Sequence, residues 1–345
     1  MFLPQPNRDE DGCGVSHDGI ADPHPENLAV RRAALFLFRA VLGLAVLAAW
    51  NGPLRAGTLY LPNASFEEPV VPPVYPYAGP DMDYWQKSSQ PAWYYPSNNF
   101  DTPWEDLTGM FFNAPNPSTF IDNCDGNQAA FLFALPDVAL FQDYNTIYGT
   151  NTTPSHAFNA HFNVNRAYSL TVGVIGGGGG MTNGATLQLS LYYRDASSNM
   201  VTVAATTITN SAQLFPTNTH LVDFSVYVPG VRATDAWAGQ NIGVQLLSSI
   251  TDTNLQGGYW DLDNVRLTET PLPALTNPGM TSTQFGFSLE SQPGLRFEIL
   301  ATTNLALPTS NWTSLGILTN TTGIANFLDP AANFSLRFYR AHQLQ

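Results

Sequence analysis

The sequence predicts an all-β protein, in which a large two-sheet sandwich is followed by a second, smaller β-sandwich. From Leu59 to Thr270, short runs of alternating apolar and polar residues are separated by Gly, Asn, Pro and Ser. No stretch with helical periodicity exceeds two turns, and a further set of short β-type runs follows residues 271–279. Many short strands at this spacing are typical of sandwiches.

Composition bounds the class of protein. The chain has 345 residues, of which 44% are hydrophobic, so it can bury a sizeable core. Its formal net charge is −14 and Lys87 is its single lysine. This balance excludes a nucleic-acid or anionic-membrane surface, both of which need clustered basic residues.

The N-terminal region has the outline of a secretory signal peptide, which we place at residues 30–56. Three arginines precede or interrupt its start, and an apolar stretch runs from Ala40 to Trp50. An uncleaved membrane anchor is the alternative, but Arg39 shortens the apolar run below the ~20 residues of a span. We therefore expect a bacterial protein that is secreted or held at the cell surface, without membrane insertion after cleavage. Residues 1–29 are expected to be a spurious or disordered extension, with Val30 as the true start.

Cysteine usage is sparse. Only Cys124 remains after removal of the segment that holds Cys13, so no intrachain disulfide is expected. A secreted β protein of this kind depends on its core, or on a bound ion, for stability.

The large domain is expected to span residues 57–270. Its clearest strand patterns are 157–164, 168–175, 186–194, 200–208, 221–228, 241–247 and 258–267. The interval 69–123 instead shows little alternation and is rich in Pro, Tyr and Trp, and long irregular loops of this kind are often functional. The glycine-rich run 173–184 lacks the Lys-Ser/Thr ending of a phosphate loop and is interpreted as a flexible strand connection.

The strand "GYWDLDNVRL" contains two aspartates. Trp260 and Leu262 share one parity, whereas the later apolar residues Val265 and Leu267 share the other. If all four lie in the core, one extra residue, a β-bulge, is present at 263–264. Asp261 is then expected to face solvent. Alternate residues on one strand cannot straddle a sugar ring as the two carboxylates of a glycosidase do.

A linker is expected at residues 271–282, where prolines are frequent. Residues 283–345 then contain four or five short runs, among them "LRFEILAT" and "LRFYRAHQ". About 65 residues with this pattern predict a small immunoglobulin- or fibronectin-like β-sandwich.

The runs 186–194, 221–228 and 241–247 suggest a ligand-binding face, formed by the polar residues that alternate with their apolar ones. If these strands share one sheet, tyrosines there lie among amides, a carboxylate and an arginine, a combination suited to sugars. The alternative is the ordinary polar outer face of an antiparallel sheet. A second candidate region is the interval 69–123, which we call the aromatic loop. The candidate binding residues on the sheet face and on the aromatic loop are Gln188, Tyr192, Arg194, Asp223, Tyr227, Gln245, Trp85, Trp93 and Tyr95.

Three short motifs resemble a known fold family. "LYLPNASFEEP", "DGNQAAFLF" and "YWDLDNVRL" are similar to segments of galactose-binding-like jelly rolls of the carbohydrate-binding-module type. The C-terminal segment resembles a small β repeat of secreted bacterial proteins. The first resemblance implies a jelly roll with a structural calcium ion where its terminal strands meet. Its implied oxygen donors are Asn63, Glu67, Asp125, Asn127 and Asp263.

Alternatives to the calcium site remain open. Asp263 could instead accept hydrogen bonds from backbone donors at the bulge, and Glu67 could be a solvated turn residue. A zinc site is not favoured, because the six histidines are scattered along the sequence.

Function is therefore predicted as follows: a secreted, non-catalytic protein that binds a neutral glycan and holds a structural calcium ion. The main alternative is a structural or adhesive envelope protein that contacts other proteins. An enzyme is the third hypothesis and ranks last. No Gly-x-Ser-x-Gly elbow is present, and neither His156 nor His161 has an identifiable nucleophile as partner.

Overall fold

The computed structural model describes residues 56–74, 78–95, 102–116, 119–147, 153–281, 284–329 and 336–344. The expected extension 1–29 and signal segment 30–56 lie outside these residues, apart from Ala56. Within the described ranges, no helix has the length and apolar character needed to cross a membrane.

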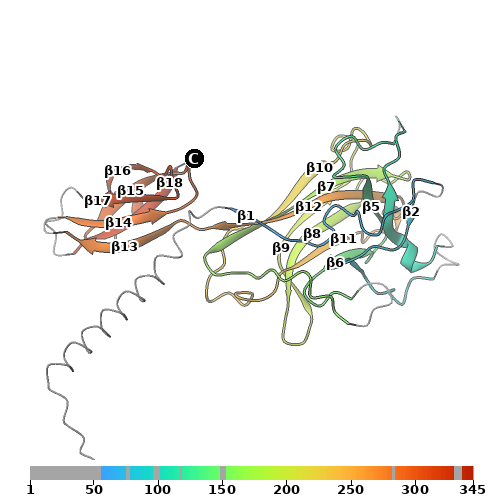
Figure 1. Cartoon of the computed structure of the whole chain (residues 1–345), viewed down its shortest axis with the longest axis horizontal. Coiled ribbons are helices and arrows are strands. Elements are labelled where there is room, and N and C mark those ends of the chain that lie inside the picture. The colour runs from blue at the N-terminus through green and yellow to red at the C-terminus, as the bar shows by residue number, and fades with distance from the viewer. Residues whose placement is uncertain are drawn as a thin grey trace, which may run out of the picture. The chain divides into compact units, whose positions relative to one another are not determined.

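The large domain is a jelly-roll β-sandwich made of two antiparallel sheets, as predicted (Figure 1). The first, called the β12 sheet, has the order β10 (Val222–Val228), β7 (Arg166–Gly178), β12 (Tyr259–Pro271), β5 (Gln128–Phe133), β4 (Thr108–Phe112) and β2 (Ala78–Gly79), with β1 (Gly57–Leu59) also paired to β12. The second, called the β8 sheet, has the order β3 (Gln86–Lys87), β6 (Ala139–Gln142), β11 (Gly243–Ser248), β8 (Thr186–Arg194) and β9 (Met200–Thr209).

The core lies between these sheets and follows the strand alternation. Leu187, Leu189 and Leu191 of β8 are buried in the same apolar cluster as Trp260 and Leu262 of β12. The residues between them in sequence therefore point to the outer faces of the two sheets. Short 3-10 turns at Trp104–Leu107 (η3) and Thr253–Leu255 (η4) complete the domain.

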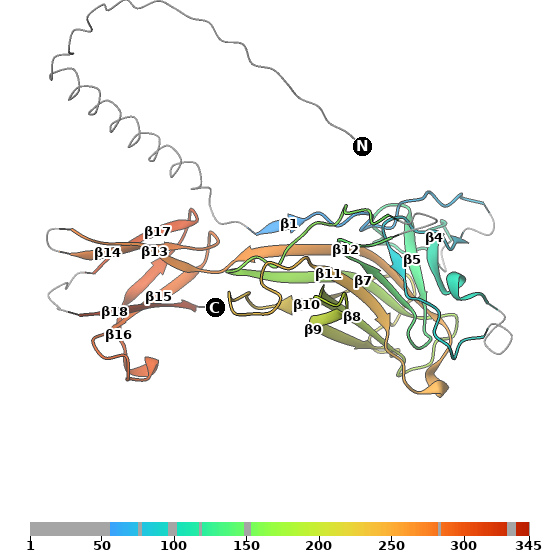
Figure 2. The same ribbon diagram turned by 90° about the horizontal axis from the view of Figure 1, so that it is seen from below.

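The predicted bulge in β12 is confirmed. Pairing of β12 with β7 shifts register between Asp263 and Arg266, and Asn264 has a φ of 54°. This left-handed conformation is more accessible to asparagine than to most residues. The extra residue places Asp261 and Asp263 on the outer face while Val265 and Leu267 return to the core. Figure 2 shows β12 running beside β1.

Two expectations about elements are corrected. Residues 157–164 form no strand; only His161 bridges Asn241, because Phe158 and Phe162 fill the core from an irregular segment. Part of the expected linker forms β13 (Ala274–Met280), which pairs with β14 (Phe285–Glu290).

The C-terminal unit is a small β-sandwich. Its two sheets have the orders β13-β14-β17 (Ile324–Leu328) and β16 (Thr313–Thr319)-β15 (Arg296–Thr302)-β18 (Phe338–Leu344), with a 3-10 turn, η5, at Thr309–Asn311. Its core contains Phe287, Leu289, Phe297 and Ile299. The immunoglobulin type of this unit stays a prediction.

Candidate active site on the outer face of the β12 sheet

Asp261 is buried on the outer face of the β12 sheet. The residue is 9% exposed, and its Oδ1 atom is buried without a hydrogen-bond partner among the described residues. The expectation that Asp261 faces solvent is therefore wrong. Strand alternation predicted its face correctly but could not show that neighbouring side chains cover that face.

Apolar and aromatic residues surround this carboxyl group. Its cross-strand partners are Phe131 on β5 and Ile175 on β7, so all three side chains point to the same face. Tyr259 lies two residues earlier on β12 and pairs with Phe133. The centroid of the Phe133 ring lies 6.0 Å from that of the Tyr259 ring and 6.1 Å from that of the Phe131 ring. We call these five residues the Asp261 site.

The surroundings change the acidity of Asp261. Burial raises the pKa of its carboxyl group from 3.8 to about 7, because an apolar environment disfavours the charged form. Burial and, to a lesser extent, the Asp261 carboxyl group also raise the pKa of Tyr259. At neutral pH the site therefore holds a carboxylic acid that is substantially protonated, as a general acid must be.

Asp263 is also buried on this face, but its side chain is bonded to the backbone of another segment. Its Oδ2 accepts a hydrogen bond from the backbone N–H of Asp125 at 2.6 Å. Burial raises its pKa to about 7, against the effect of hydrogen bonds from the backbone of Asp125 and Asn264. Asp263 thus ties β12 to the turn before β5.

These two carboxyl groups predict an unusual dependence of stability on pH. Because their pKa values are raised in the folded state, the native protein binds more protons than the unfolded chain between pH 4 and 7. Their contribution to the free energy of unfolding falls as pH rises through this window, by up to about 4 kcal/mol each. Asp261→Asn removes one of them and should be the more stable protein at pH 8. Urea unfolding at pH 4 and pH 8 measures this, and equal pH slopes for both proteins would contradict it.

Two of the predicted calcium ligands, Glu67 and Asp263, contact the turn 125–128, which carries Asp125 and Asn127. Glu67 Oε1 accepts the backbone N–H groups of Asn127 at 2.7 Å and Gln128 at 2.8 Å. Asn63 is used within its own turn, where its side chain bonds the backbone of Glu68. No group of three or more His, Cys, Asp or Glu side chains is arranged to hold a metal in the part of the chain that the structure describes. The calcium ion stays a prediction.

The predicted glycan face is divided between two sheets. Gln188, Tyr192, Arg194 and Gln245 belong to the β8 sheet, whereas β10, which carries Asp223 and Tyr227, is an edge strand of the β12 sheet. The premise of one shared sheet is therefore wrong. Asp223 accepts a hydrogen bond from Arg266 Nη2 at 2.5 Å, and Tyr227 is exposed on the surface.

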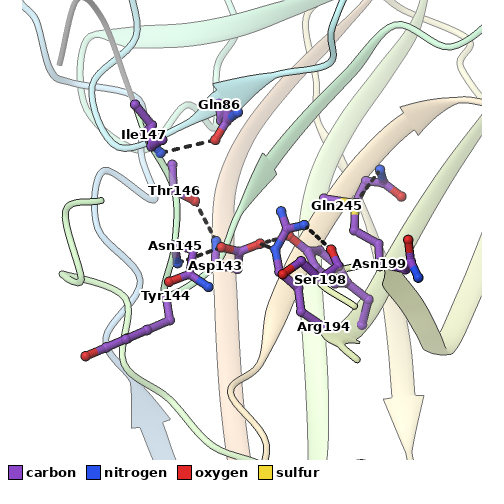
Figure 3. Close-up of polar contacts among 12 residues, drawn as sticks. Gln86, Asp143, Tyr144, Asn145, Thr146, Ile147, Arg194, Ser198, Asn199 and Gln245 are labelled. Carbon is purple, nitrogen blue, oxygen red and sulfur yellow. Dashed lines mark hydrogen bonds and ion pairs between the residues drawn. The ribbon is translucent and has the colours of Figure 1, made fainter. Parts of the chain in front are cut away.

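On the β8 sheet, three of the four candidate polar residues bond to residues that were not candidates (Figure 3). Asp143 accepts hydrogen bonds from the Tyr192 hydroxyl at 2.6 Å and from Arg194 Nε at 2.7 Å. Arg194 Nη1 also donates to the backbone carbonyl of Ser198, and Gln245 Nε2 approaches Met200 Sδ. This cluster ties β8 to the segment after β6.

A crevice of about 180 Å³ lies beside this cluster. Its lining includes Tyr144, Asn145, Gln240 and Asn241, which are polar. Small-molecule sites are usually larger, about 300–1,000 Å³, and mostly apolar. The crevice therefore has the character of a hydrated surface recess.

The three aromatic-loop candidates differ in their environment. Trp85 is 2% exposed, packs on Phe66 and donates its indole N–H to the backbone carbonyl of Asn63, so it is a core residue. Trp93 and Tyr95 remain exposed. Trp93 donates to Asp137 Oδ2 at 3.2 Å.

Sequence reasoning missed Phe131, Phe133 and Tyr259 as members of a site. A signal was present in "AAFLF", since a strand that is apolar on both parities is covered on both faces. An aspartate paired with such a strand is a candidate for burial.

Comparison with known proteins places this fold among cyclases. A family model described as "HpiC1-like: HpiC1 cyclase" matches residues 58–268, which include the whole Asp261 site. The Stig cyclase Fisc from Fischerella sp. TAU, in complex with (3Z)-3-(1-methyl-2-pyrrolidinylidene)-3H-indole, is 20% identical with a TM-score of 0.44, covering 63% of this chain and 100% of that one. A Fischerella sp. TAU cyclase with 4-(1H-indol-3-yl)butan-2-one is 21% identical with a TM-score of 0.43, at 63% and 100% coverage. No curated relative matches the chain.

Carbohydrate-binding modules are also among the solved structures to which the chain is similar. The CBM22-1 xylan-binding domain of Paenibacillus barcinonensis Xyn10C is 12% identical with a TM-score of 0.28, covering 53% of this chain and 83% of that one.

The family match corrects the predicted function. We expected a non-catalytic carbohydrate-binding protein, but the family is that of a cyclase, which is an enzyme. Fold resemblance led to the wrong class because one jelly-roll scaffold carries unrelated functions. Since the match extends over more than half of the sequence, the chain belongs to the HpiC1-like cyclase family.

Proposed function

We propose that this protein is a cyclase that closes a ring in an apolar, unsaturated substrate by general acid catalysis at Asp261. The carrying observation is the buried carboxyl group itself, which has a pKa raised to about 7 and an oxygen without a hydrogen-bond partner among the residues that the structure describes. A carboxylic acid in an apolar site can remain neutral near pH 7 and donate its proton to a bound molecule.

The aromatic side chains suit the charge that such a step creates. Protonation of a carbon–carbon or carbon–nitrogen π bond leaves a cation on the substrate. The faces of aromatic rings attract cations, and this attraction is strongest where water is excluded. Phe131, Phe133 and Tyr259 supply three such rings next to Asp261.

The proposed reaction is redox-neutral. Asp261 transfers its proton to the substrate, and a second π bond of the same molecule attacks the resulting cation to form the new ring bond. A proton then leaves the substrate and returns to the Asp261 carboxylate. The product is an isomer of the substrate, and no external oxidant or reductant is required.

A direct test is a screen for isomerisation. The purified protein is incubated at pH 6 with alkenyl-substituted aromatic compounds, including 3-substituted indoles, the compound class bound by the Fischerella cyclases. We expect a product of unchanged mass with one additional ring, identified by mass spectrometry and NMR. The rate should decrease as pH rises through about 7, where Asp261 loses its proton. A product formed at equal rates at pH 6 and pH 9 would contradict acid catalysis by this residue.

Export and calcium binding remain proposals that rest on the sequence. The basic, apolar segment 30–56 supports export through a signal peptide to the cell surface or medium. Proximity of Glu67 and Asp263 to the turn 125–128 supports calcium, although both carboxylates accept hydrogen bonds from backbone N–H groups there. Neutral glycan and envelope proteins stay predictions as partners.

A further inference from the structure

Two rings of the Asp261 site lie across glycines of neighbouring strands. Tyr259 pairs with Gly178 of β7, and a Cβ atom added to Gly178 would lie 2.5 Å from Tyr259 Cε2. Phe131 pairs with Gly109 of β4, where an added Cβ would lie 2.7 Å from Phe131 Cζ and nearer still to the backbone oxygen of Gly79. Real Cβ atoms do not approach other atoms so closely, so each ring occupies space that only a glycine leaves open.

The order of strands in the β12 sheet shows over which neighbouring strand each ring lies. Tyr259 is on β12 and leans outward onto β7, whereas Phe131 is on β5 and leans outward onto β4. Because β12 and β5 are adjacent, the two rings lean away from the seam between their strands. Asp261 and Phe133 lie at this seam.

We propose that Gly178 and Gly109 are specificity-determining residues, which hold the Tyr259 and Phe131 rings apart and so admit a flat aromatic substrate to Asp261. This inference rests on the proposed function and adds its substrate shape. Gly178 acts through the Tyr259 ring, whereas Gly109 makes room both for the Phe131 ring and for the backbone oxygen of Gly79. With a methyl group at Gly178, the Tyr259 ring loses its place on β7 and has to turn toward the seam.

The structure offers a matched control on the other sheet. Gly243 of β11 pairs with Tyr192 of β8, and an added Cβ there would overlap the Tyr192 ring. This pair has the same cross-strand arrangement but lies on the outer face of the β8 sheet. A purely structural role of glycine–aromatic pairs predicts similar behaviour at Gly178 and Gly243, whereas the proposal predicts a difference in ligand binding.

The test uses two neutral probes of different shape, flat indole and globular camphor, in NMR titrations of the full mature protein at temperatures where circular dichroism shows each variant folded. Wild type should prefer indole. Gly178→Ala should weaken indole binding by about tenfold or more, as expected for a filled space, while Gly243→Ala stays within about twofold of wild type. Indole binding by Gly178→Ala at wild-type strength, or an equal loss in Gly243→Ala, would overturn the proposal.

A second variant avoids the crowded glycine. Tyr259→Leu removes the ring and needs no glycine beneath it, so it should bind camphor better and lose most of the preference for indole. An unchanged preference in Tyr259→Leu would also refute the proposal, even if Gly178→Ala fails to fold. These experiments measure binding and not turnover, so a failure of acid catalysis is distinguishable from a failure of this inference.

Discussion

Replacement of Asp261 by asparagine is expected to lower kcat of the cyclisation by about 10²–10⁴-fold, the usual contribution of a positioned general acid. Asparagine has nearly the same shape, so the apolar neighbours Phe131 and Ile175 keep their contacts. Its amide group cannot deliver an acidic proton. The measurement is kcat at pH 6 for the compound that isomerises, with KM expected to change by less than about threefold.

Asp263→Asn is the matched control for this variant. Asp263 lies two residues further along the same face, has a similarly raised pKa and also has an Oδ1 atom without a partner among the described residues, but its Oδ2 is engaged by the backbone N–H of Asp125. Asparagine retains an oxygen that can accept this hydrogen bond. We expect kcat to remain within about threefold of wild type. If Asp263→Asn loses catalysis and Asp261→Asn keeps it, the acid has been assigned to the wrong residue.

Local sequence pattern predicted the strands of the sandwich well. The run 186–194 coincides with β8, and the parity slip at Asp263 and Asn264 is a bulge in the structure. These features depend on the period-2 alternation of side chains, which is set by the chain itself. A segment such as 157–164 imitates this alternation, since its phenylalanines fill the core without a strand.

The site depended on information that alternation does not contain. Asp261 was placed on the correct face but assigned to solvent, because its cover comes from Phe131 and Ile175, which are about 130 and 86 residues away in the chain. Similarly, Asp223 and Tyr192 were assigned to one face although their strands belong to different sheets. Sheet membership is a matter of topology, and this topology places β8 and β10 in different sheets.

Loss of the Asp143 carboxylate is expected to destabilise the large domain by about 2–4 kcal/mol, because Asp143 is buried while its partner Arg194 is partly exposed. The Asp143 side chain is 5% exposed and receives both the Arg194 guanidinium and the Tyr192 hydroxyl. In Asp143→Ala the guanidinium loses its counter-ion, and the hydroxyl of the buried Tyr192 is left without an acceptor. Urea unfolding at pH 7, followed by tryptophan fluorescence, measures the change in free energy.

Asp195→Ala serves as the comparison, because Asp195 lines the same crevice but is exposed and bonds only nearby residues of its own turn, Ser197 and Asn199. Its loss should cost about 1 kcal/mol or less, since exposed groups exchange protein partners for water. Equal effects of the two substitutions would mean that the Asp143–Arg194 pair is solvated in solution. A large difference, with cyclisation unimpaired in both folded variants, would separate this polar cluster from catalysis and leave the chemistry to the outer face of the β12 sheet.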